Sequence, residues 1–113
     1  LQALEWLTAL VTRAREIAGT RRIGIFGTAI AGSWLFGEIE ERVEFFVDED
    51  PQRVGKRYLG RPVLHPDDIP PGAQLLIPLP PAIACAIAPR IQRPGIVCHQ
   101  PPPLPPSKPS RGL

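Results

Sequence analysis

Three small residues and one carboxylate have the types and spacing of a phosphate-binding turn. Gly27, Ala29 and Gly32 follow a short apolar run, and Asp48 comes 21 residues after Gly27. In a mononucleotide-binding β-α-β unit, the first glycine makes a tight turn, the second lets phosphate approach the backbone, and the third lets the helix pack against the strand. A carboxylate about 20 residues later accepts a hydrogen bond from ribose. The pattern therefore predicts a nucleotide-binding crevice.

The donors of this crevice would be main-chain N–H groups at the start of the helix, which also carries a positive dipole end. We expect Gly27, Thr28, Ala29 and Ile30 to present them to phosphate. Alanine at the second position weakens the fingerprint, because its methyl group intrudes where a pyrophosphate would lie. Two interpretations stay open: an anion or nucleotide site, and a tight strand-to-helix turn in a fold that holds no ligand.

The acidic cluster that contains Asp48 also has two interpretations. Asp48 stands where a ribose-binding carboxylate would stand, but the cluster could equally be a solvated turn in which Asp50 caps the next segment. Arg53, Lys56 and Arg57 follow, and they either meet a phosphate or remain solvated surface cations.

Alternating apolar runs and helical patterns predict the elements that position these residues. Residues 1–18 form an amphipathic helix that Gly19 ends. A second helix runs from about residue 29 to 41, with Ile30, Trp34, Leu35 and Ile39 on its inner face. A third covers 82–88 and should break or kink at Pro89. Strands are expected at 23–26, 43–47, 61–64, 74–79 and 95–99.

This alternation predicts an α/β fold, a small doubly wound parallel sheet of Rossmann-like type. Numbered along the chain, its strands should follow the order 3-2-1-4-5, with 23–26 in the centre between 43–47 and 74–79. The expected organisation is an N-terminal linker helix over 1–19 that packs on the domain, the domain itself over 20–100, and a proline-rich flexible tail over 101–113.

Charge and composition exclude several classes of function. The net charge of +2 is too small for a nucleic-acid groove or a membrane-docking face, and no run is long enough to span a bilayer. We expect a cytoplasmic protein that binds neither nucleic acid nor membrane. Cys85 and Cys98 have no partner spacing for zinc and are expected to be buried thiols, so no metal site is predicted.

No motif for nucleophilic or acid-base catalysis surrounds the candidate side chains. His65 and His99 have no paired nucleophile in a recognisable motif, and Ser33 lies inside a predicted helix without a hydrolase elbow. We therefore predict no catalytic residue in this chain.

Several stretches together resemble one family, the C-terminal Rossmann-like domain of S-adenosylmethionine-dependent C-methyltransferases. They are Ile25-Phe26-Gly27-Thr28-Ala29-Ile30-Ala31-Gly32, Phe46-Val47-Asp48-Glu49-Asp50-Pro51, Gly55-Lys56-Arg57, Gly60-Arg61-Pro62-Val63 and Leu79-Pro80-Pro81. The resemblance covers residues 20 to 100. Residues 48–63 also resemble the N-terminal domain of nucleotide-sugar acyltransferases.

The resemblance implies an accessory domain that helps to recognise a substrate, often a nucleotide-linked sugar. The S-adenosylmethionine would bind a separate N-terminal methyltransferase domain of the same protein, which is then the expected partner. This chain lacks the donor-binding signature, so it is expected to hold no cofactor and to be inactive alone. The chain opens in mid-helix with Leu1, which favours a piece of a longer protein.

Two other functions stay open. The glycine turn and Asp48 also suit an NAD(P)-type dinucleotide-binding domain of an oxidoreductase, although Ala29 disfavours it. The third possibility is a structural interaction module with an empty Rossmann-like fold, which would use the apolar region 73–98 as its interface.

Overall fold

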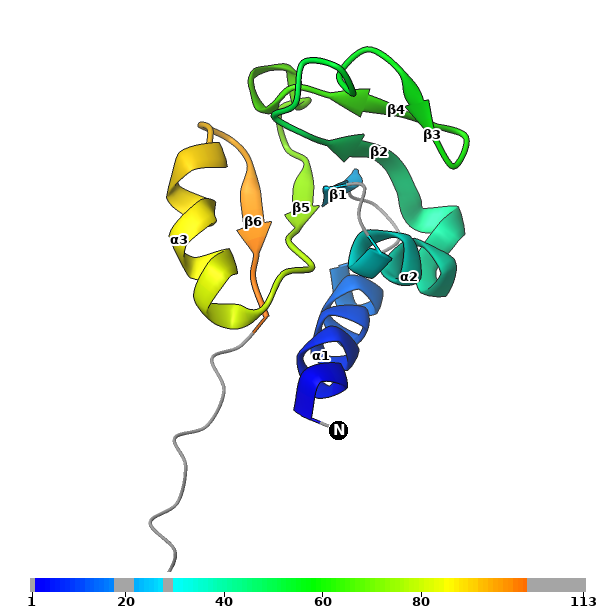
Figure 1. Ribbon diagram of the computed structural model, residues 1–113, viewed down its shortest axis with the longest axis vertical. Coiled ribbons are helices and arrows are strands. Elements are labelled where there is room, and N and C mark those ends of the chain that lie inside the picture. The colour runs from blue at the N-terminus through cyan, green and yellow to red at the C-terminus, as the bar shows by residue number, and fades with distance from the viewer. Residues whose placement is uncertain (1, 18–21, 28–29, 102–113) are drawn as a thin grey trace, which may run out of the picture.

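A mixed sheet with helices on both of its faces forms the body of the protein (Figure 1). The structure is a computed structural model that describes residues 2–17, 22–27 and 30–101. Within them the helices are α1 (Gln2–Ile17), α2 (Ile30–Ile39) and α3 (Pro81–Ile91), and short 3₁₀ turns cover Glu40–Arg42 and Pro66–Asp68. The strands are β1 (Ile23–Phe26), β2 (Val43–Val47), β3 (Arg57–Tyr58), β4 (Arg61–Leu64), β5 (Gln74–Leu76) and β6 (Val97–His99).

The strand order is β3-β4-β2-β1-β5-β6, which differs from the predicted order 3-2-1-4-5. The difference is β3, a two-residue strand that pairs antiparallel with β4 at one edge, so the sheet is mixed and not wholly parallel. The other five strands pair parallel, and β1 lies between β2 and β5 as predicted. A two-residue strand has no alternation to detect, and its hairpin turn, Leu59-Gly60, lacks the usual Asn-Gly signal.

A β-bulge in β2 distributes its large side chains between the two faces of the sheet. The register between β1 and β2 slips at Glu44, which is the extra residue of the bulge. Val43 therefore shares a face with Phe46, whereas Phe45 and Val47 lie on the opposite face. Both halves of the core thus receive an aromatic ring from one five-residue strand.

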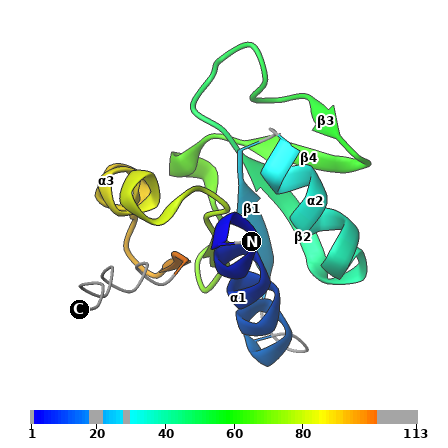
Figure 2. The ribbon, with the colours of Figure 1, turned by 60° about the horizontal axis from the view of Figure 1, so that its bottom comes forward.

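The helices α1 and α2 cover one face, and α3 covers the other (Figure 2). The first layer packs apolar side chains from both helices on the sheet: Leu10, Val11, Ala14, Ile23, Ile25, Leu35, Phe36, Ile39, Val43, Phe46, Val63 and Leu76. Packing of the N-terminal helix on the domain is therefore as predicted. Trp34 was expected on the inner face of α2, but it is 41% exposed, because the helix buries Leu35 and Ile39 instead.

The layer on the other face of the sheet contains α3, and this helix ends later than predicted. This helix buries Ala84, Ala88 and Ile91 against the sheet and continues through Pro89 without ending. Pro89 lies in the last turn on the exposed side, where only one internal hydrogen bond is lost, to the carbonyl of Cys85, and water can reach that carbonyl. Cys85 lies on the same exposed side, so it is not the buried thiol that was predicted.

Cys98 fits the prediction better, because it is half-buried against the α3 layer, and burial raises the pKa of its thiol. Of the predicted tail, only Pro101 is described, and its side chain is buried; residues 102–113 lie outside the described part. In the described ranges, no helix is long and apolar enough to cross a bilayer.

One polar pair lies at the β5–β6 edge of the sheet. Gln74 is the buried polar residue of the core, and its Oε1 lies 2.5 Å from Nε2 of the half-buried His99. Because an amide oxygen can only accept, the imidazole donates this hydrogen bond. Burial, and then the positive charge of Arg13, lower the pKa of His99.

This lowered pKa predicts that the protein loses stability as pH falls below about 6.5, the usual value for histidine in an unfolded chain. The unfolded state then binds the proton more readily than the folded state, so protonation favours unfolding. Urea unfolding between about pH 7.5 and pH 5.5 should show this decline, and His99→Gln should reduce it. His65→Gln is the control, since His65 is the other histidine of the chain and its side chain is 42% exposed. An equal effect of both substitutions on the pH dependence would contradict the assignment to His99.

Candidate functional site

The chain leaves β1 through a turn that only glycine adopts without strain. Gly27 has a φ of +89°, in the left-handed region. Its main-chain N–H donates to the carbonyl of Val47 at 2.6 Å, which continues the β1–β2 ladder by one residue. This N–H group is therefore engaged within the sheet and does not face a phosphate, contrary to the expectation for Gly27.

The other predicted donors lie at the start of α2. Thr28 and Ala29 are outside the described residues, and Ile30 is the first residue of α2. The structure thus has a helix that begins at Ile30, near the end of β1. The main-chain donors that Thr28, Ala29 and Ile30 would present to phosphate remain a prediction.

The third glycine of the fingerprint brings the helix against the turn. A Cβ placed on Gly32 would lie 2.8 Å from the carbonyl oxygen of Gly27, closer than side chains approach a backbone atom. The first turn of α2 can therefore contact the end of β1 only because position 32 has no side chain. This is the packing role that the fingerprint assigns to its third glycine.

Asp48 lies at the carboxyl end of β2, where the sequence placed it, and is held by two neighbours. Its Oδ1 accepts the main-chain N–H of Asp50 at 2.9 Å, and its Oδ2 lies 3.6 Å from Nη1 of Arg53. The side chain of Asp48 is only 15% exposed. These contacts orient the carboxylate before any ligand binds. A ribose hydroxyl that bonds to Asp48, as predicted, would bind beside the Asp50 N–H and Arg53.

Asp50 performs the capping role that was the alternative for this cluster. Its Oδ1 accepts the N–H of Gln52 at 2.9 Å, and its carbonyl accepts the N–H groups of Arg53 and Val54. The segment beyond it is tied to β4, because Gly55 N–H donates to Val63 O at 2.9 Å. In the loop between β2 and β3, the main-chain N–H groups of Asp48, Asp50 and residues 52–56 therefore all have acceptors.

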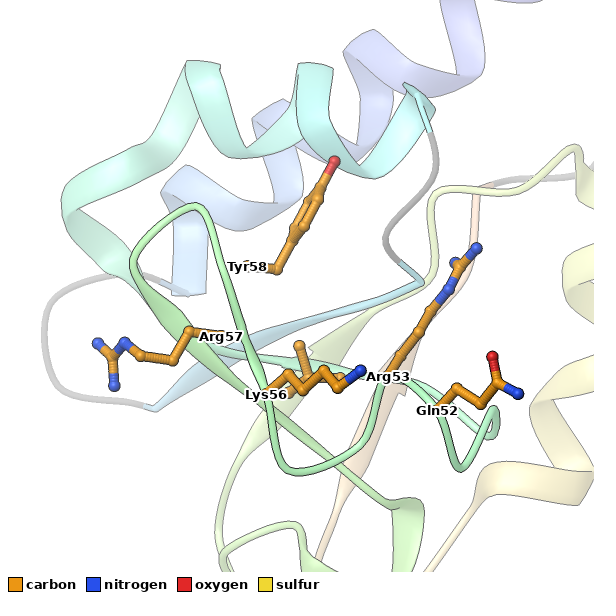
Figure 3. Close-up of a pocket in the computed structure, with 6 residues that line it drawn as sticks. Gln52, Arg53, Lys56, Arg57 and Tyr58 are labelled. Carbon is orange, nitrogen blue, oxygen red and sulfur yellow. The ribbon is translucent and has the colours of Figure 1, made fainter.

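This loop forms the wall of an open pocket of about 360 Å³ (Figure 3). Its lining residues are Gln52, Arg53, Lys56, Arg57, Tyr58 and Val63. Arg53 of this lining lies 3.6 Å from Asp48 at the end of β2, whereas in Figure 3 Arg57 points away from Arg53 and Lys56. The pocket therefore adjoins the crevice that the glycine turn and Asp48 predicted.

Tyr58 fixes the hairpin that carries this wall. Its hydroxyl lies 2.5 Å from Oγ of Ser33 in α2, and its ring meets that of Phe46 edge-on, with 5.1 Å between centroids. Ser33 thus has a structural partner in the hairpin. Nothing in the sequence around Tyr58 indicated this contact, because it depends on β3 folding back beside α2.

The charges around the pocket do not balance. Arg53 lies between Asp48 and Asp50, at 3.6 and 3.7 Å, and Arg57 donates to the carbonyl of Gly60 at 2.5 Å. Within the part of the chain that is described, no carboxylate lies within 4.0 Å of the Lys56 ammonium. The described lining of the pocket itself contains cationic side chains and no carboxylate, which favours an anionic ligand.

The remaining polar side chains have structural roles. Nδ1 of His65 accepts the N–H of Asp67 at 3.0 Å and caps the 3₁₀ turn, while His99 contacts Gln74 at the opposite edge of the sheet. Over residues 2–17, 22–27 and 30–101, no three His, Cys, Asp or Glu side chains gather as metal ligands would.

The contact at Gly32 predicts a difference between two glycines of the same helix. Gly32→Ala should destabilise the protein by about 1 to 3 kcal/mol relative to Gly37→Ala, because the new methyl group would press on the Gly27 carbonyl. At Gly37 an added Cβ meets nothing within 4 Å, so this control gains only the helix propensity of alanine, about 0.5–1 kcal/mol. Chemical denaturation measures both, and equal stability of the two variants would contradict the contact.

Comparisons with known proteins found no relative of this chain. Models of protein families, curated proteins and solved structures were each compared with the chain, and none of them matches it. The residues at the site and the family resemblance of the sequence are therefore the basis for a functional proposal.

Proposed function

We propose that this chain is the accessory, C-terminal substrate-recognition domain of an S-adenosylmethionine-dependent C-methyltransferase. Its ligand is a nucleotide or nucleotide sugar, bound at the carboxyl ends of β1 and β2. The domain is not catalytic alone. The methyl donor belongs to a methyltransferase domain N-terminal to it, and the complete protein is cytoplasmic in this proposal.

The observation that carries the proposal is the pocket beside Asp48 at the carboxyl ends of the strands. In open α/β sheets, ligands bind outside these ends, near the point where successive connections leave in opposite directions. Here β2 follows β1 on one side, whereas β5 lies on the other side of β1. Parallel strands with helices on both faces also support the Rossmann-like classification.

The individual residues support a nucleotide ligand in different ways. Gly27 and Gly32 bring the start of α2 to the end of β1, which is where a ligand's phosphate would meet the helix N-terminus. Asp48 has a fixed carboxylate that can accept from a ribose hydroxyl. We keep Thr28, Ala29 and Ile30 as proposed neighbours of the phosphate.

The test is calorimetry of the folded chain with UDP-glucose, NAD⁺ and S-adenosylmethionine. UDP-glucose should bind, and S-adenosylmethionine should bind no tighter than about 0.1 mM, roughly 5.5 kcal/mol. NAD⁺ binding tighter than UDP-glucose would instead favour the oxidoreductase function. Donor binding tighter than about 0.1 mM, or the absence of any nucleotide binding, would overturn the proposal.

The role of Asp48 predicts a selective loss in the same assay. Asp48→Asn should weaken UDP-glucose binding by about 1 to 2 kcal/mol, because a charged acceptor becomes neutral. Asp68→Asn is the matched control, since Asp68 is exposed in the turn after β4 and lies outside the pocket. If both substitutions weaken binding equally, Asp48 does not contact the ligand.

A further inference from the structure

The pocket beneath the β2–β3 loop has a charge pattern that the glycine fingerprint does not include. The fingerprint places phosphate on main-chain N–H groups, yet the N–H of Gly27 is bonded to Val47. The cations of the pocket come instead from the loop, from Arg53 and Lys56. We propose that this pocket is a phosphate site, in which these two side chains bind the phosphate groups of the ligand. That the ligand is a nucleotide rests on the proposed function.

The loop holds these two side chains on a fixed platform. The N–H groups of Arg53 and Val54 donate to Asp50 O, and that of Lys56 donates to Arg53 O at 3.2 Å. The carbonyl of Lys56 in turn accepts from Val63 N–H at 2.8 Å. Because these main-chain N–H groups are already paired, we expect the Arg53 and Lys56 side chains to supply the contacts to a ligand. A platform of this kind reduces the entropy lost when a ligand binds.

Arg53 is oriented by its acidic neighbours. Its Nη1 lies near Asp48 and its Nε near Asp50, at 3.6 and 3.7 Å. A guanidinium group carries its N–H donors in a fixed planar fork, so these two contacts set its direction. Both acids follow β2 closely in the chain, so the guanidinium lies at the carboxyl end of β2, where the nucleotide is proposed to lie.

Lys56 supplies the positive charge that is not balanced. Among the described carboxylates, none pairs with its ammonium, and the neighbouring Glu49 is engaged elsewhere. Arg90 of α3 binds both oxygens of Glu49, at 3.0 and 2.6 Å, and this hydrogen bond lowers the pKa of the Glu49 carboxyl. Glu49 is therefore held by Arg90 of α3, and no carboxylate is among the described residues that line the pocket with Lys56.

The size of the pocket suits a small anion. A volume of about 360 Å³ lies at the lower end of the range for small-molecule sites. Two cations are too few for the run of phosphates in a nucleic acid. Tyr58 is held by Ser33 and Phe46, so its ring serves as a wall and does not move to stack on a base. The chemistry therefore favours a phosphate or diphosphate group.

The experiment titrates inorganic pyrophosphate and UDP into the wild-type chain and two charge-matched variants. Lys56→Gln should weaken the binding of both probes by about tenfold, the size expected for loss of a charge-assisted contact. Arg22→Gln removes the same charge just before the amino-terminal end of β1, where Arg22 pairs with Glu44, and should change binding less than twofold. Thermal unfolding checks that both variants fold, which is expected because both side chains are exposed.

The outcomes separate this site from the proposed function. If UDP-glucose binds and Lys56→Gln binds it as the wild type does, the phosphate site is overturned and the nucleotide function stands. If pyrophosphate binding depends on Lys56 but UDP binds no tighter than pyrophosphate, the site stands and the nucleotide function falls. Absence of pyrophosphate binding, or equal losses for Lys56→Gln and Arg22→Gln, would also overturn the site.

Discussion

The close contact between Gly32 and the carbonyl of Gly27 is the constraint on which the candidate site depends. It lets α2 begin directly against the end of β1. From that position Ser33 meets the hydroxyl of Tyr58, and this bond holds the β3–β4 hairpin beside the helix. The hairpin in turn closes the loop that carries Lys56. The absence of a side chain at Gly32 therefore helps to position the β3–β4 hairpin, which comes about 25 residues later in the chain.

The sheet can support this arrangement because β2 contributes to both layers of the core. The bulge at Glu44 sends Phe46 toward α1 and α2, where its ring contacts Tyr58, and sends Phe45 toward α3. The ring of Phe45 lies over Gly24, where a Cβ would overlap it. Glycine thus permits close packing at two points of the β-α-β unit. Gly24 makes room for the Phe45 ring of the neighbouring strand, and Gly32 lets α2 contact the Gly27 carbonyl.

Local sequence patterns predicted the helices and strands that have clear apolar periodicity. The features that the sequence did not predict depend on tertiary contacts or on solvent exposure. The apolar run at 23–26 and the helical spacing of α1 were sufficient to predict β1 at the centre and a helix packed on it. The hairpin strand β3, the helix through Pro89 and the exposure of Trp34 were missed, because each depends on a neighbour or on solvent. At the site, spacing placed Asp48 correctly at the strand end. It could not reveal that Val47 engages the Gly27 N–H, or that Tyr58 reaches Ser33.

The account proposes a phosphate-bearing ligand at the carboxyl ends of β1 and β2, and backbone amide chemical shifts recorded during a UDP-glucose titration test this most directly. The account predicts saturable shifts in residues 47–58 and in the first turn of α2, while α3 and β6 stay unchanged. Shifts confined to residues 81–99, with 47–58 unaffected, would contradict it. In that case the ligand would bind at the opposite edge, and the loop cations would be solvated surface charges.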